Sequence, residues 1–267
     1  MTRLAGALGA EITGVDLRSA DERLISQIRE TWLEHSVVFF RDQSLGPKEF
    51  SAFARSFGEV VHYPFLKGLD EAPEVITVAK LEHERVNFGG LWHTDTAYLE
   101  RPPMATMLIA REVPPVGGDT LFASGYAAYE ALSDGMKQLL EPLRAVNSSA
   151  QAEKTRTRED RKAGEERQVL DAVHPVVRTH PETGRKALYV SGGHTARFVG
   201  MTEDESAGLL NYLFMHQVRP EFTCRFRWEP GSIAFWDNRC ALHNPVNDYH
   251  GSRRIMHRVT LAGDVPR

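Results

Sequence analysis

His93-Thr94-Asp95 and, 150 residues after His93, His243-Asn244-Pro245 are the stretches that decide how this chain must fold. Two imidazoles and one carboxylate make up a facial triad, which holds Fe(II) and leaves the opposite positions of the metal open. Residues two apart on an extended strand point to the same side, so we expect His93 and Asp95 to share a strand and bind one ion. His243 must then come from a second strand alongside. A lone His-x-Asp occurs often by chance, and the motif gains its weight from the residues after His243.

Two arginines follow His243 at a spacing that indicates anion binding. Arg254 and Arg258 have the same parity, so both face one side of a strand, whereas Arg253 and His257 face the other. The neighbouring residues are apolar, which predicts a buried strand, and a buried guanidinium requires an anionic partner. A guanidinium binds a carboxylate or sulfonate through two parallel hydrogen bonds. We therefore expect two anionic ligands, a cosubstrate and a substrate.

Further motifs stand in order along the chain: Gly6-Ala7-Leu8-Gly9-Ala10-Glu11-Ile12, Pro102-Pro103, Gly117-Gly118-Asp119-Thr120 and His174-Pro175-Val176-Val177-Arg178-Thr179-His180-Pro181. With Trp92-His93-Thr94-Asp95 and the block from Phe235 to Arg258, they span nearly the whole chain. On these motifs the chain resembles the TauD/TfdA-like (taurine dioxygenase-like) family of Fe(II)/2-oxoglutarate-dependent dioxygenases.

The resemblance implies a role for each residue of the iron and cosubstrate sites. His93, Asp95 and His243 are expected to bind Fe(II) and to be the catalytic centre. Thr120 and Arg254 are expected to bind 2-oxoglutarate, and O₂ is the second cosubstrate. The hydroxyl of Thr120 as a carboxylate donor rests mainly on the resemblance.

The resemblance also implies where a substrate binds. Arg258 is expected to meet the anionic end of a small organic substrate, and His62 to reach the same anion. His194 lies where the taurine enzyme has an aromatic pocket residue, so we expect it to line the substrate pocket. Phe65 and the segment Phe88-Gly89-Gly90-Leu91 depart from the taurine enzyme as well, which argues against taurine itself.

The activity that follows is hydroxylation of a sulfonate, sulfate ester or carboxylate, with release of succinate and CO₂ and with possible cleavage of a C–S or C–O bond. The same chemistry on an aryloxyalkanoate is one alternative. A zinc-dependent hydrolase, in which the His/Asp/His set activates water, is another. Only the dioxygenase interpretation explains Thr120 and Arg254, and oxygen dependence of turnover separates the two. A binding module without chemistry is a third possibility, but the triad is intact.

Composition narrows the class of protein. The chain has 267 residues, of which 42% are hydrophobic, and a net charge of −4, which gives no sign of nucleic-acid or membrane binding. No stretch is long and apolar enough to span a bilayer, and the first residues lack the apolar core of a signal peptide. The only cysteines are Cys224 and Cys240, which fits a reducing cytoplasm. The resemblance adds the expectation of a homo-oligomer.

The resemblance implies a single domain over residues 1–267 with flanking helices, and the pattern of apolar residues predicts that its core is mainly β. We expect helices over residues 21–36, 48–57 and 127–143, and a fourth that begins at the capping box Thr202-x-x-Glu205. Strands are expected over residues 37–40, 75–78, 105–110, 187–191, 223–228, 232–236 and 255–261. Many short strands with turn glycines and prolines favour a closed or double-sheet core. The family's fold is of this kind, a double-stranded β-helix (jelly roll, cupin-like).

One charged insertion, at about residues 150–168, stands apart. Eleven of the fifteen residues from 153 to 167 are charged, with both signs mixed. Its composition is typical of a solvated helix or loop. Its place next to the substrate pocket in relatives favours a lid over the active site.

Overall fold

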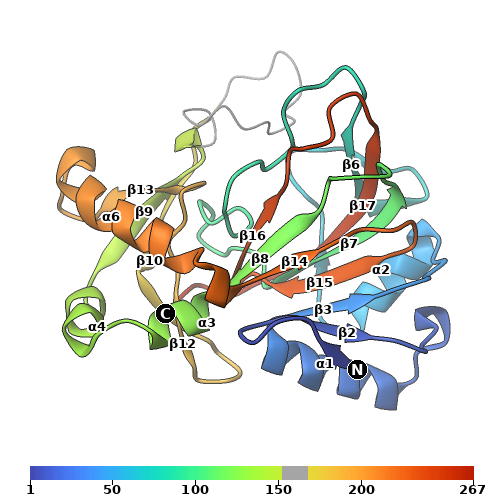
Figure 1. Cartoon of the computed structure of the whole chain (residues 1–267), viewed down its shortest axis with the longest axis horizontal. Coiled ribbons are helices and arrows are strands. Elements are labelled where there is room, and N and C mark those ends of the chain that lie inside the picture. The colour runs from blue at the N-terminus through green and yellow to red at the C-terminus, as the bar shows by residue number, and fades with distance from the viewer. Residues whose placement is uncertain (152–167) are drawn as a thin grey trace.

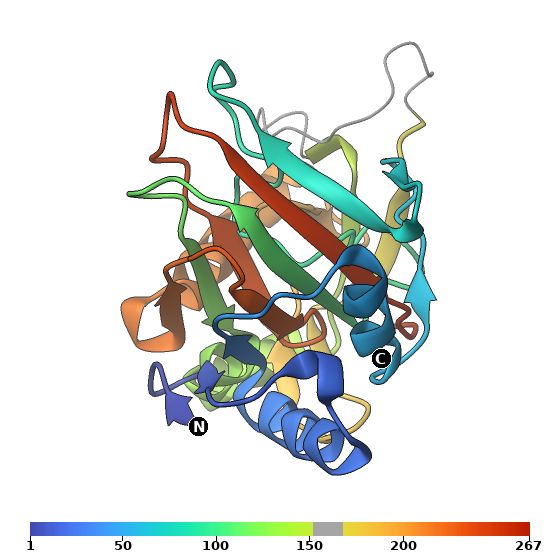
Figure 2. The same cartoon turned by 90° about the vertical axis from the view of Figure 1, so that its right-hand side faces the viewer.

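A large mixed sheet and a smaller antiparallel sheet form the centre of the molecule (Figures 1 and 2). The computed structural model describes residues 1–151 and 168–267. The strands of the large sheet lie in the order β1 (Thr2–Arg3), β2 (Ala10–Ile12), β3 (Val37–Phe40), β15 (Ile233–Asp237), β7 (Ala105–Glu112), β17 (Arg254–Leu261), β6 (Ala72–Lys80) and β5 (Gly68–Leu69), with β4 (Val60–Val61) beside β17. The small sheet has the order β14 (Thr223–Phe226), β8 (Thr120–Ser124) and β16 (Ala241–Pro245). This architecture confirms the predicted jelly-roll core.

The segment from Val37 to Phe40 is apolar throughout because both faces of the large sheet are covered. Val38 and Phe40 pack on the side of the two N-terminal helices, α1 (Glu22–His35) and α2 (Pro47–Arg55). Val37 and Phe39 point the other way, into the apolar layer shared with the small sheet. Figure 2 shows the two blue helices in front of the large sheet. Leu108, Trp228 and Trp236 of this inner layer also line one of the cavities near the two motifs.

A second lobe lies beside the small sheet (Figure 1). Its strands are β9 (Arg144–Ser148), β10 (Asp171–Pro175), β11 (Val177–Thr179), β12 (Lys186–Leu188) and β13 (Thr195–Phe198). Its helices are α3 (Gly125–Glu130), α4 (Asp134–Leu140) and α6 (Glu203–Gln217). Two short 3-10 helices, η1 (Leu17–Ser19) and η2 (Pro220–Phe222), complete the described elements. The lobe has its own apolar cluster, with Leu140, Phe198 and Leu213 among its buried residues.

The expected elements agree with the structure except in a few places. The capping box is confirmed, because the Thr202 side chain accepts from the backbone N–H of Glu205 and the Glu205 side chain accepts from that of Thr202. The single helix expected over residues 127–143 is wrong. Ser133 caps α4 by accepting a hydrogen bond from the backbone N–H of Met136, so the segment divides into α3 and α4. The charged segment at 153–167 lies outside the described residues, and no helix of the described ranges is long and apolar enough to cross a membrane.

The stacked pair Trp32 and Phe235 joins α1 to the large sheet. Their ring centroids are 4.5 Å apart at an interplanar angle of 9°, and Phe57 contacts Phe235 at 4.9 Å. Phe235→Ala should lower the free energy of unfolding by about 3–5 kcal/mol, because it removes a fully buried ring and leaves a cavity. Chemical denaturation measures the change. Tyr212→Ala, on a ring that is 44% exposed, is the control and should cost less than about 1 kcal/mol. Equal losses would contradict this account of the core.

Candidate metal centre and its two cavities

An antiparallel bridge between His93 and His243 brings the two distant motifs together. The backbone N–H of His93 donates to the carbonyl of His243 at 3.0 Å, and that of His243 donates to the carbonyl of His93 at 2.8 Å. His243 lies on β16, as expected. The expectation that His93 and Asp95 share an extended strand is wrong, because the chain turns at Asp95 and Thr96 takes a φ of +41°. The three side chains still converge.

The three predicted ligands form one buried donor set. His93 Nε2 and His243 Nε2 each lie 3.8 Å from Asp95 Oδ1. This separation is too long for a hydrogen bond. It suits donors that surround one ion at about 2.0–2.2 Å each. The set therefore fits a divalent metal such as Fe(II).

Both imidazoles are uncharged, as metal binding requires. His93 Nδ1 donates to the carbonyl oxygen of Leu91 at 2.6 Å, so the lone pair of its Nε2 faces Asp95. Burial lowers the pKa of His93 and lowers that of His243 well below its ordinary value. Uncharged rings of this kind are the form that binds metals.

Asp95 is held by two groups on its outer oxygen, Oδ2. Thr106 Oγ1 donates to it at 2.6 Å, and Arg258 Nη2 forms an ion pair with it at 3.1 Å. Burial alone would raise the pKa of Asp95, but the charge of Arg258, the two imidazoles and the Thr106 hydroxyl together hold it below its usual range. The carboxylate is thus charged, with Oδ1 facing the imidazoles. Thr106 had no signal in the sequence, where it reads as one residue of an apolar strand.

The first cavity, of about 50 Å³, lies between the metal ligands and Arg254. Thr120, Trp228 and His243 also line it. Arg254 is 6% exposed, and its Nε and Nη2 atoms have no hydrogen-bond partner among residues 1–151 and 168–267. Trp228 Nε1 donates to Thr120 Oγ1 at 2.9 Å, so the Thr120 hydroxyl keeps its own proton to donate. The free donors of Arg254 and the Thr120 hydroxyl therefore favour an anionic ligand in this cavity.

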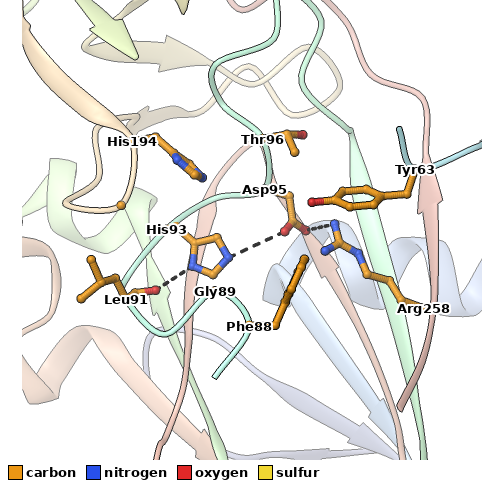
Figure 3. A pocket seen from close by; sticks show the side chains of 10 residues that line it. Tyr63, Phe88, Gly89, Leu91, His93, Asp95, Thr96, His194 and Arg258 are labelled. Atoms are coloured by element: carbon orange, nitrogen blue, oxygen red, sulfur yellow. Dashed lines mark hydrogen bonds and ion pairs between the residues drawn. The ribbon is translucent and has the colours of Figure 1, made fainter. Parts of the chain in front are cut away.

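The second cavity, of about 30 Å³, is lined by His93, Asp95 and Arg258 among other residues (Figure 3). Arg258 lines both cavities, and its guanidinium carbon lies 4.9 Å from the centre of the Tyr63 ring. His194 also lines this cavity and meets His93 edge-on at 5.8 Å. Burial, followed by the neighbouring His93, lowers the pKa of His194 to about 3. Besides His93 and Asp95, the cavity therefore presents a permanent cation, Arg258, and a neutral imidazole, His194.

Gly89 and Thr96 line the second cavity with unusual backbones. Gly89 has a φ of +65°, and a Cβ there would lie 2.9 Å from His93 Cε1, so this position requires glycine. Thr96 is a β-branched residue in the left-handed region, where such residues are rare. Its buried hydroxyl makes no hydrogen bond within the described chain. Strain of this kind is found at functional sites.

His62 does not lie where the sequence predicted. Its side chain is exposed and its Nδ1 lies 3.2 Å from the Pro73 carbonyl, whereas the adjacent Tyr63 lines the second cavity. Residues of one extended segment alternate in direction, so the loop that was expected to reach the cavity does so through Tyr63. Contact of His62 with a substrate stays a prediction, but His62 lines neither of the two cavities. Phe65 packs on Tyr63 and Tyr98 instead of lining the cavity.

His180, Asp237 and Cys240 form a second group of possible metal donors. The carboxylate of this group already binds an arginine. Arg239 contacts both oxygens of Asp237, through Nε at 2.8 Å and Nη2 at 2.7 Å. Burial raises the pKa of Cys240 to about 12, which disfavours the thiolate that a metal needs. This group is a structural ion network.

Comparisons with known proteins identify the family of this chain. The model of the family described as taurine catabolism dioxygenase TauD, TfdA family matches residues 1–260. The alkylsulfatase of Acinetobacter baylyi is 36% identical over 99% of this chain and 85% of its own length. The alpha-ketoglutarate-dependent sulfate ester dioxygenase of Pseudomonas putida is 36% identical over 98% of this chain and 89% of its own length.

A solved structure is similar throughout. The crystal structure of a putative alpha-ketoglutarate-dependent taurine dioxygenase from Burkholderia xenovorans superposes with a TM-score of 0.86 at 39% identity. The match covers 99% of this chain and 93% of that one. The chain therefore belongs to the taurine catabolism dioxygenase TauD, TfdA family.

Proposed function

We propose that this dioxygenase uses Fe(II), 2-oxoglutarate and O₂ to oxidise a small organic anion, with a sulfate ester as the favoured class. One observation carries the proposal. The buried Arg254, whose Nε and Nη2 lack partners in the described residues, shares a cavity with the donors His93 and His243. A desolvated guanidinium beside a metal site requires an anion that belongs to the reaction. A metal-activated hydrolysis gives Arg254 no such role.

In this proposal, His93, Asp95 and His243 hold the iron. Arg254 and Thr120 hold the distal carboxylate of 2-oxoglutarate through charge-assisted hydrogen bonds. When bound, the iron, 2-oxoglutarate and O₂ supply the oxidation of a substrate C–H bond, with release of succinate and CO₂. The protein contributes position and charge, and the cofactor carries the oxidation.

Arg258 selects the substrate by its charge. It is 5% exposed, lines the second cavity, which Arg254 does not line, and has an unpartnered Nε in the part of the chain that the structure describes. A planar guanidinium binds an oxyanion with two N–H groups and thereby orients the neighbouring C–H bond. The names of the two relatives above favour a sulfate ester over a sulfonate. Hydroxylation of the carbon that bears the ester oxygen gives an unstable product, which breaks down to an aldehyde and sulfate. A cytoplasmic homo-oligomer stays a prediction.

A panel of small anions tests the proposal. Purified protein with Fe(II) and 2-oxoglutarate should form succinate fastest with hexyl sulfate, more slowly with hexanesulfonate, and least with phenoxyacetate. Matched reactions under argon should form none, since O₂ is a reactant. Release of sulfate from hexyl sulfate under argon would contradict the dioxygenase and favour the zinc hydrolase. Fastest turnover of phenoxyacetate would overturn the substrate class alone.

Arg254→Lys tests the cosubstrate site. Lysine keeps the charge but loses the planar two-pronged fit, and loss of one charge-assisted hydrogen bond costs about 1.5–3 kcal/mol, or about 10- to 150-fold in affinity. The KM for 2-oxoglutarate should rise by this factor, with a small effect on the KM for the substrate. Arg253→Lys is the matched control, because Arg253 is adjacent but exposed and pairs with Glu82 at the surface. An unchanged 2-oxoglutarate KM with a raised substrate KM would exchange the roles of Arg254 and Arg258.

Arg258→Ala should uncouple the reaction. The variant should still form succinate slowly but yield little oxidised product, because the group that orients the substrate anion is gone. Succinate and product are measured side by side on the best anion of the panel. Mn(II) affinity is measured in parallel, because Arg258 also contacts the metal ligand Asp95. A variant that binds Mn(II) normally and stays fully coupled would show that Arg258 does not hold the substrate.

A further inference from the structure

A chain of three hydrogen bonds ends on the outer oxygen of Asp95. Trp236 Nε1 donates to Asn238 Oδ1 at 2.9 Å, and Asn238 Nδ2 donates to Thr106 Oγ1 at 3.1 Å. Thr106 Oγ1 then donates to Asp95 Oδ2 at 2.6 Å. The direction is unambiguous, because an indole N–H only donates and a charged carboxylate only accepts. The Thr106 proton is therefore committed to Asp95.

This chain of donors also contacts His243 and the residue between His93 and Asp95. The ring of Trp236 packs 4.7 Å from that of His243. The backbone carbonyl of Asn238 accepts from Thr94 Oγ1 at 2.7 Å, which fixes the residue between His93 and Asp95. Thr106 and Asn238 are fully buried, so the interactions are made within the protein and exclude solvent. Such outer partners orient metal ligands and are nearly as important as the ligands themselves.

We propose that Thr106 and Asn238 are positioning residues that make Asp95 a ligand through one oxygen only. Oδ2 is occupied by the Thr106 hydroxyl and by Arg258, whereas Oδ1 faces both imidazoles at 3.8 Å. A metal held by two imidazoles and a single carboxylate oxygen would keep positions free for other ligands. The use of those positions rests on the proposed function, but the positioning concerns metal binding alone.

Thr106 and Arg258 differ in what else they can contact. Arg258 lines both cavities and is shared between Asp95 and any anion that enters. Thr106 is fully buried and lines neither cavity, so a ligand cannot draw its hydroxyl away from Asp95. Thr106 is therefore the constant donor to Oδ2 when Arg258 turns to a substrate.

Mn(II) titration of the metal-free protein tests the positioning role. Thr106→Val keeps the shape of the side chain but removes the hydroxyl, and Mn(II) affinity should fall by about 10- to 100-fold. Thr106→Ser restores the hydroxyl and should restore most of the affinity. Thr260→Val is the matched control, since Thr260 is a buried threonine on β17 directly opposite Thr106 and makes no contact with Asp95 among the described hydrogen bonds. Thr106→Ala, which leaves room for water beside Asn238, replaces the valine variant if that variant does not fold.

Turnover gives a second readout. Thr106→Val and Thr106→Ala should lose kcat at saturating Fe(II), whereas Thr106→Ser should keep most of it. The substrate KM should change little in all three variants, because the anion site at Arg258 is intact. Wild-type Mn(II) affinity and kcat in folded Thr106→Val would overturn the positioning role and leave the proposed function standing. Failure of the wild-type protein to bind Mn(II) would instead overturn the metal centre and, with it, both proposals.

Discussion

Two backbone hydrogen bonds between His93 and His243 are the constraint on which the site depends. They attach the turn that carries His93 and Asp95 to β16, a strand of the small sheet, and so join residues that are 150 positions apart in sequence. Because each histidine is paired at its backbone, the two side chains start from directly opposite positions. The ring centroids of His93 and His243 lie 4.1 Å apart. The large sheet supplies Thr106 from β7 and both arginines from β17, and the small sheet supplies Thr120 from β8.

One strand, β17, supplies the arginines that line the two cavities. Arg254 and Arg258 lie on the same face of β17, and both are buried, whereas Arg253 between the loop and the strand is exposed. Arg254 faces the cavity next to Thr120 and Trp228, and Arg258 borders both cavities beside Asp95. Two guanidiniums inside a protein are unfavourable unless anions accompany them. Each arginine therefore calls for an anion. Asp95 partly meets the need of Arg258 and does not meet that of Arg254.

Much of the fold and of the site could be predicted from sequence, because strand alternation and helix capping depend on residues that are close along the chain. The parity of Arg254 and Arg258, the strand of His243 and the capping box at Thr202 depend on residues close in sequence. The turn at Thr96 could not be predicted, because packing rather than residue type imposes its positive φ. Thr106 was also missed, since a threonine in an apolar strand shows its hydrogen bond only once Asp95 is beside it. The division between α3 and α4 did carry a signal, the helix-capping Ser133, which the apolar pattern obscured.

The central claim is that the metal ligands and the Arg254 cavity form one site rather than two. Calorimetric titration of 2-oxoglutarate under argon, into protein with and without Mn(II), tests this most directly. If the two parts act together, 2-oxoglutarate should bind tightly, at one molecule per chain, only when the metal is present, because Arg254 and Thr120 hold one carboxylate and the metal holds the other end. Equal affinity with and without the metal would contradict the account.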